Sequence, residues 1–262
     1  MKQTYYIFLS LLLLSLTFSC DTIEKDNFTD PGASFPWLGK KVLIEDFTGY
    51  KCTNCPAAST ELHTIEELYT DKVIGIAVHA GFFAQPSGVF VTDFRTDEGE
   101  ELVEFFEPSA FPIGMVNRIG YPENALIEYT DWATEVSSQL LQAPTIELSI
   151  SEENNIINVE ARRLSDDNNS LKLVVCITED GVIYKQIDGS DLIEDYEHNH
   201  MLRKVLNGTW GSSIQLSNTT STFSYNYTLD DSWVRSNCNV VAFVYDNSNK
   251  EVLQAEKIHL TD

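Results

Sequence analysis

The sequence predicts an α/β domain followed by an all-β antiparallel sandwich. Strand-like and helix-like apolar patterns alternate up to residue 143. At Ala143-Pro144 the hydrophobic period changes from 3.6 to 2, and short alternating segments separated by turn-forming residues follow. With 262 residues, of which 43 % are hydrophobic, the chain is long enough for two domains with cores of their own.

The first 40 residues predict export and a lipid anchor. Lys2 precedes an apolar run over 7–18 that is too short to span a bilayer, so we expect a signal peptide over 1–19. Ser19-Cys20 resembles a bacterial lipoprotein box, despite the bulky Phe18, and no better cleavage site is present. The alternative is a plain secretory signal with a chance cysteine. We expect Cys20 to be lipidated, which anchors the chain to a membrane, and residues 20–40 to form a tether.

The predicted α/β domain covers residues 41–143. KVLIEDFT over 41–48 and VIGIAVH over 73–79 are buried-type strands, and an amphipathic helix over 56–69 lies between them. This order predicts a right-handed βαβ unit with parallel strands. Residues 80–110 form an insertion with a short acidic helix, and a further strand and an amphipathic helix complete the domain.

The predicted sandwich covers residues 144–262. TIELSI, NIINVEARR and TFSYNYTL alternate apolar and polar residues, and LKLVVCIT, NVVAFVYD and VLQAEKIHL are further strands. Turn signals such as SDDNNS and DNSNK separate them. The pattern is typical of an immunoglobulin-like sandwich.

A C-x-x-C motif, Cys52 to Cys55, has three interpretations. A zinc site needs further ligands at set spacing, which the chain lacks. A purely structural bridge closes a very small loop and adds little stability. A redox dithiol fits best, because the motif lies between a buried strand and a helix N-terminus, where the helix dipole and Lys51 stabilise a thiolate at Cys52. Cys55 is then the resolving cysteine.

The segment KVLIEDFTGYKCTNCP resembles the active-site strand and helix of the thioredoxin superfamily. The resemblance implies that Asp46 is a buried carboxylate that assists proton transfer at the resolving cysteine. It also implies a cis-proline beside the dithiol, for which Pro112 is the candidate; the alternative is an ordinary trans proline. The residues between the cysteines, Thr53-Asn54, differ from those of thioredoxin itself, so the reduction potential stays open.

Nearly the whole mature chain resembles the outer membrane protein twenty-eight related lipoproteins of Gram-negative bacteria. DYEHNHMLRKVLNGTWG over 195–211 resembles that group's most recognisable segment. The resemblance implies an outer-membrane lipoprotein with a thioredoxin-like domain and a β-sandwich. It leaves open whether the protein faces the periplasm or the outside.

Two weaker signals concern the second half. Cys176 and Cys238 lie in predicted strands, where they form either a disulfide or two buried thiols. His198 and His200 would share a face only if their segment is a strand, and no third ligand is assigned, so a polar connection between strands is the preferred interpretation. We expect no metal and no cofactor.

The function predicted from these features is thiol–disulfide exchange on the thiols or disulfides of exported proteins. If the protein is an enzyme, it is a thiol–disulfide oxidoreductase. The rival hypothesis is a non-catalytic surface or binding lipoprotein, whose sandwich contacts a partner and whose Cys52–Cys55 bridge is structural. The formal net charge of -23 argues against nucleic acid as a partner, because the acidic chain and the phosphate backbone would repel each other.

Overall fold

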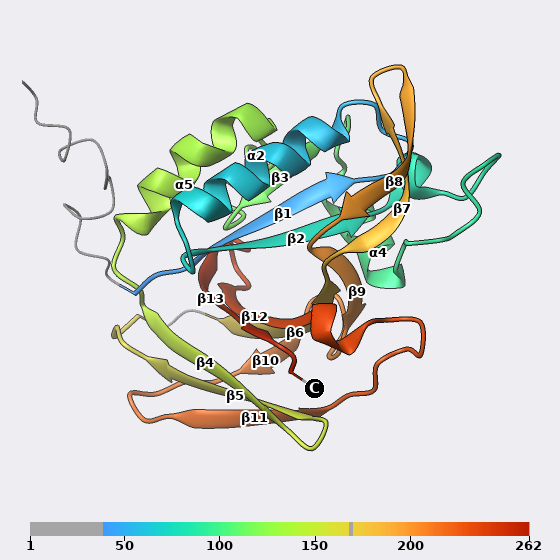
Figure 1. Cartoon of the computed structure of the whole chain (residues 1–262). Helices are drawn as coiled ribbons and strands as arrows, with labels where there is room; N and C mark the ends of the chain where they lie inside the picture. Colours follow the sequence, from blue (N-terminus) through green and yellow to red (C-terminus); the bar gives the residue numbers. More distant parts are fainter. Residues whose placement is uncertain (1–38, 168–169, 262) are drawn as a thin grey trace, which may run out of the picture. The chain divides into compact units, whose positions relative to one another are not determined.

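Strands from both halves of the chain join one mixed sheet of eight strands in the computed structural model (Figure 1). The structure describes residues 39–167 and 170–261. The predicted signal peptide, Cys20 and nearly all of the tether lie outside the described residues. No helix within the described residues is long and apolar enough to cross a membrane.

The predicted βαβ unit is present at one end of the sheet. β1 (Val42–Thr48) and β2 (Val73–His79) pair in parallel, and α2 (Cys55–Leu68) connects them. β3 (Ile113–Val116) pairs antiparallel with the other edge of β1. All residues of β1 and β2 are buried, as expected for strands covered on both faces.

The two helices α2 and α5 (Trp132–Leu140) cover one face of β1, β2 and β3. The apolar stripe of α2, which includes Leu62 and Ile65, and the buried Trp132 and Val136 of α5 pack there against Val42 and other strand residues. The 3.6-residue period of both helices therefore determines which side chains enter this core.

The opposite face of β1 and β2 packs against strands of the second half. These strands are β6 (Leu171–Glu179), β12 (Cys238–Asp246) and β13 (Val252–His259). β9 (Met201–Val205) connects the two parts of the sheet, because it pairs antiparallel with β6 and in parallel with β2 at Ala77. One hydrophobic core is thus built from both halves of the chain.

The remaining strands form two smaller sheets. β4 (Ile146–Glu153), β5 (Ile156–Arg163) and β11 (Ser221–Asn226) form a three-stranded sheet that packs against the far face of β6 and β12. β10 (Ser212–Ile214) pairs with β6 and is the eighth strand of the main sheet. β7 (Val182–Asp188) and β8 (Asp191–His198) form a hairpin that is a separate two-stranded sheet.

Four short elements complete the fold. Residues 80–110 contain α3 (Gly81–Ala84) and the predicted acidic helix, α4 (Asp97–Phe106). The 3-10 helices η2 (Tyr129–Asp131) and η3 (Arg235–Asn237) precede α5 and β12.

The predicted fold class, a thioredoxin-like α/β domain followed by an immunoglobulin-like antiparallel sandwich, is wrong. The protein is mostly β, with 42 % strand and 19 % helix, and its sheets are mixed. Periodicity identifies single strands, but it does not encode which distant strand each one pairs with. Here β9 joins β2 instead of closing a separate sandwich. The domain boundaries at 40/41 and 143/144 stay predictions.

Candidate functional site

The C-x-x-C motif forms a disulfide at the start of α2. The Cα atoms of Cys52 and Cys55 are 5.4 Å apart, and Cys55 is the first residue of the helix. Gly49 opens this loop because α3 passes close to it: a Cβ there would lie 2.5 Å from the carbonyl carbon of Phe83. The backbone N–H of Lys51 donates to the Phe83 carbonyl at 3.0 Å, so α3 supports the loop from one side.

The β7–β8 hairpin holds the same loop from another side. The backbone N–H of Ile187 donates to the Tyr50 carbonyl at 2.9 Å. The backbone N–H of Gly189 donates to the Thr53 carbonyl, also at 2.9 Å. Two amides of the hairpin are therefore bonded to the loop that carries the disulfide, and residues far apart in the sequence form one site.

Gln186 of the hairpin completes this contact. Its side-chain Nε2 donates to the Cys52 carbonyl at 3.0 Å and to the Ile187 carbonyl at 2.8 Å. Only 3 % of Gln186 is exposed, and Cys52 and Cys55 are 1 % and 2 % exposed. The disulfide is buried in this conformation.

Aromatic residues tie residues 80–110 to the site. The Tyr50 ring stacks on Phe90 with 4.8 Å between centroids. The Tyr184 hydroxyl of β7 accepts hydrogen bonds from the backbone N–H groups of Val91 and Thr92 at 2.7 and 2.9 Å. The predicted insertion and the hairpin thus contact each other as well as the C-x-x-C loop.

A small polar cavity of about 20 Å³ lies next to Cys55. Asp46 of β1, His79 of β2 and the hairpin residues Tyr196 and His198 contribute to its walls. Asp46 Oδ1, His79 Nδ1 and His198 Nε2 are buried without a hydrogen-bond partner. Buried polar atoms normally have one, so their gathering around one cavity is unusual.

The buried Asp46 carboxyl has a strongly raised pKa. Burial raises the pKa of its carboxyl from 3.8 to about 7, and the nearby His200 opposes part of this increase. Its neighbour Glu45 is also buried, but it is paired with Arg118 by two hydrogen bonds of 2.6 and 2.7 Å. Asp46 is thus the member of this acidic pair that lies near the disulfide, where its carboxyl exchanges protons near neutral pH.

Two histidines near Asp46 are held neutral. Burial lowers the pKa of His79 well below its ordinary value, and the charge of Arg203 lowers it further. Burial also lowers the pKa of His198 to about 4. The sequence predicts a polar connection at His198, with a metal ligand as the less favoured alternative, and it assigns no role to His79 or Gln186. The sequence feature that could have pointed to His79 is its position as the last residue of the predicted buried strand over 73–79.

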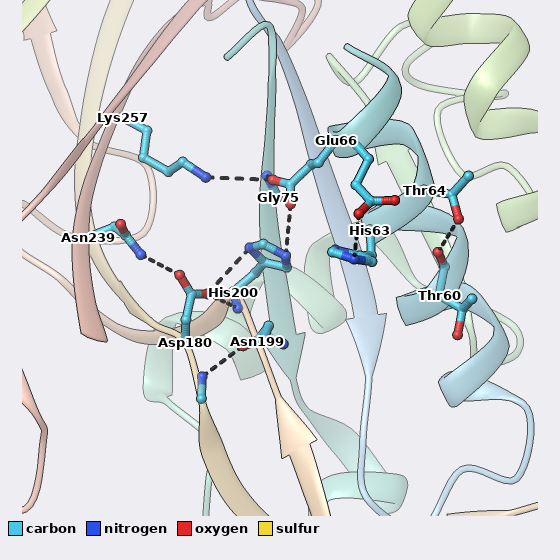
Figure 2. Close-up of polar contacts among 12 residues, drawn as sticks. Thr60, His63, Thr64, Glu66, Gly75, Asp180, Asn199, His200, Asn239 and Lys257 are labelled. Atoms are coloured by element: carbon cyan, nitrogen blue, oxygen red, sulfur yellow. Dashed lines mark hydrogen bonds and ion pairs between the residues drawn. The ribbon is translucent and has the colours of Figure 1, made fainter. Parts of the chain in front are cut away.

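His200 contacts two acidic side chains from other parts of the fold (Figure 2). Its Nε2 is 3.1 Å from Glu66 Oε2 of α2, and its Nδ1 is 3.5 Å from Asp180 Oδ1. Lys257 Nζ of β13 lies 3.6 Å from Glu66 Oε1. Burial acts to raise the pKa of Glu66, but the hydrogen bond and charge of His200, with Lys257, outweigh it and lower the pKa. These contacts join α2 to β13 and to the connection between β8 and β9.

No group of three or more histidine, cysteine, aspartate or glutamate side chains in the described part of the chain has the arrangement of a metal site.

Pro112 follows a cis peptide bond, Phe111–Pro112, and directly precedes β3. The antiparallel register pairs Phe47 with Ile113, which brings Pro112 to the end of β1 where the C-x-x-C loop begins. A role for Pro112 in shaping a partner site stays a prediction. A second cis bond, Tyr121–Pro122, was not expected.

Cys176 and Cys238 are free and buried, so the disulfide alternative for this pair is wrong. In the β6–β12 ladder Cys176 pairs with Val241, whereas Cys238 pairs with Glu179. An offset of three residues is about 10 Å along a strand and turns the two side chains to opposite faces. They belong to different cores, and a bridge needs Cα atoms within about 7 Å.

Residues 100–262 match the protein family described as outer membrane protein Omp28, which is more than half of the chain. The chain belongs to the Omp28 family. This membership confirms the family and the outer-membrane location expected from the sequence.

Solved structures similar to this Omp28-family protein include HBP35 of Porphyromonas gingivalis, with a TM-score of 0.69 and 17 % identity over 85 % of this chain and 76 % of that chain. A protein of Agrobacterium tumefaciens has a TM-score of 0.55 and 13 % identity over 84 % and 94 % of the two chains. At these identities the likeness concerns the fold alone.

A domain of the outer membrane lipoprotein Omp28 from Porphyromonas gingivalis is 20 % identical over 46 % of this chain and 91 % of that chain, with a TM-score of 0.30. The comparison with curated proteins gave no match.

Proposed function

We propose that this outer-membrane protein exchanges disulfides with exported proteins through Cys52 and Cys55. The observation that carries the proposal is the shared cavity of Cys55 and Asp46. A carboxyl with a pKa of about 7 is both a proton donor and a proton acceptor near neutral pH. The start of α2 adds a dipole that favours a thiolate on the reduced motif.

The proposed reaction has two steps. In the reduced protein, the Cys52 thiolate attacks one sulfur of a partner disulfide, and the partner's other sulfur leaves as a thiolate. Cys55 then gives its proton to the Asp46 carboxylate and attacks the Cys52 sulfur of the mixed disulfide. The second partner thiolate leaves, so the partner is reduced and the Cys52–Cys55 bridge forms. Both steps are reversible, and Pro112 is proposed to shape the partner site.

One observation favours the rival function, a binding lipoprotein with a structural bridge. Both cysteines are almost fully buried, whereas an exchanging cysteine must be reached by its partner. In that case the strands of the second half carry partner binding, and the bridge serves only to hold the C-x-x-C loop.

A redox titration separates the two functions. The protein with Cys20→Ser is equilibrated in glutathione buffers, and Cys52 and Cys55 are followed by alkylation and mass. A midpoint between about -120 and -270 mV supports exchange, and one below about -300 mV without exchange supports the structural bridge. Cys52→Ser discriminates further, because it is expected to abolish exchange if the first function is right and to leave partner binding unchanged if the rival is right.

The membrane contact is proposed to be a lipid on Cys20. Cys20→Ser is then expected to release the protein from the membrane fraction, and mass spectrometry of the unaltered protein is expected to find an acylated Cys20. Recovery of the Cys20→Ser protein in the membrane fraction would contradict this anchor. Nucleic acid is not a proposed partner, because the chain is strongly acidic.

A further inference from the structure

The β7–β8 hairpin is a two-stranded sheet that pairs with no third strand in the described residues. A two-stranded hairpin is only marginally stable alone, so its position depends on the contacts that it makes. Three of its apolar side chains, Ile183, Leu192 and Ile193, are exposed by 55, 41 and 38 %. Its position is therefore determined by the inner contacts that it makes with the rest of the protein.

Three of those inner contacts fall on the C-x-x-C loop. They are the backbone hydrogen bonds from Ile187 to Tyr50 and from Gly189 to Thr53, and the side-chain bond from Gln186 to the Cys52 carbonyl. All three are donated by the hairpin to carbonyls of residues 50–53. Lifting the hairpin breaks these bonds together and leaves the main sheet paired as before.

Thiol–disulfide exchange requires the attacking sulfur to reach the sulfur under attack. In this conformation the hairpin covers a bridge whose cysteines are 1 and 2 % exposed. We propose that the β7–β8 hairpin is an autoinhibitory lid, which lifts from the C-x-x-C loop before any thiol reaches Cys52. This role rests on the proposed exchange activity, and Gln186 is the positioning residue that fastens the lid.

The cavity next to Cys55 extends the same argument. Gln186, Tyr196 and His198 are walls contributed by the hairpin, whereas Asp46 and His79 belong to β1 and β2. Lifting the hairpin therefore opens the disulfide and the proton-exchanging Asp46 to water in one movement. The same hairpin therefore controls access to the Cys52–Cys55 sulfurs and to the Asp46 carboxyl.

The test measures the rate at which dithiothreitol reduces the Cys52–Cys55 bridge in the folded protein, by alkylation and mass. Gln186→Ala removes the one side-chain hydrogen bond from Gln186 to the Cys52 carbonyl of the loop, together with a bond inside the hairpin, and the loss of the bond to the loop is expected to raise the open population and the rate about fivefold. Glu194→Gln is the matched control: it lies on the same hairpin, is exposed and pairs with Lys185 at 2.5 Å, away from the loop. Its rate is expected to equal that of the unaltered protein. Equal rates in all three proteins would overturn the lid.

Amide hydrogen exchange gives a second measurement. The Ile187 and Gly189 amides are expected to exchange through an opening that costs less than global unfolding, and faster in Gln186→Ala. If both exchange only by global unfolding, the hairpin is not a lid.

The lid and the proposed function fail differently. Glutathione exchange at an equal rate in all three proteins keeps the function and refutes the lid. If dithiothreitol reduces Gln186→Ala faster than the unaltered protein, and the Cys52–Cys55 bridge of the unaltered protein has a midpoint below about -300 mV, the lid is supported and the exchange function is refuted.

Discussion

Replacing Asp46 by asparagine is expected to stabilise the protein, and increasingly so as the pH rises. The Asp46 carboxyl is buried, and its Oδ1 has no hydrogen-bond partner. Burial raises its pKa from 3.8 to about 7, so the folded state binds a proton more tightly than the unfolded state does. Stability is therefore lost as the pH rises from the unfolded value through the folded one.

The size of the effect follows from the two pKa values. A change from 3.8 to about 7 corresponds to about 4 kcal/mol of unfolding free energy, all of which is lost above pH 7. Asp46→Asn cannot ionise and avoids this loss. The variant is expected to match the unaltered protein below pH 4 and to exceed it by as much as about 4 kcal/mol at pH 8.

The assay is urea unfolding of the oxidised protein at pH 4, 6 and 8, followed by circular dichroism. Asp191→Asn serves as the control, because Asp191 is an exposed aspartate in the hairpin. Its effect is expected to stay within about 0.5 kcal/mol at each pH. A difference between Asp46→Asn and the unaltered protein that does not change with pH would refute the reasoning.

Three further predictions concern the cores. Arg118→Met leaves Glu45 charged and buried, so unfolding experiments are expected to show a loss of about 3 to 5 kcal/mol, which a second change, Glu45→Leu, largely restores. Gly211→Ala is expected to destabilise the protein by about 1 to 3 kcal/mol more than Gly189→Ala: both have positive φ, but only the first places a Cβ against a neighbouring carbonyl oxygen. The two free cysteines are expected to resist iodoacetamide at pH 8 until the protein is unfolded, because burial raises the pKa of both thiols; labelling of the native protein, followed by mass, would contradict this.

Local features were predictable from the sequence because their causes lie within a few residues. The strand over 73–79 has the predicted bounds, the strand before Cys52 begins one residue later than predicted, and the helix after it is shifted by one residue at both ends. Apolar periodicity and a proline in the first helical turn act over these short distances. The same is true of the bridge, since two cysteines at this spacing at a helix start are already close.

Features made by distant residues were not predictable in this way. Gln186 bonds to the carbonyl of Cys52 across 134 residues, and its own neighbourhood in the sequence contains no sign of that partner. Cys176 and Cys238 lie on adjacent strands, but the register turns them to opposite faces. Registers and partners are decided by the packing of whole sheets.

By itself, the sequence determined the βαβ elements, the disulfide, the family and, with it, the outer-membrane location, because each depends on a local pattern or on a recognisable segment. Only the tertiary structure decided that β9 joins both halves of the chain in one sheet. It also decided that the β7–β8 hairpin covers the bridge and that Asp46 shares a cavity with two neutral histidines. These arrangements arise from long-range burial and hydrogen bonding, which place residues side by side irrespective of their order along the chain.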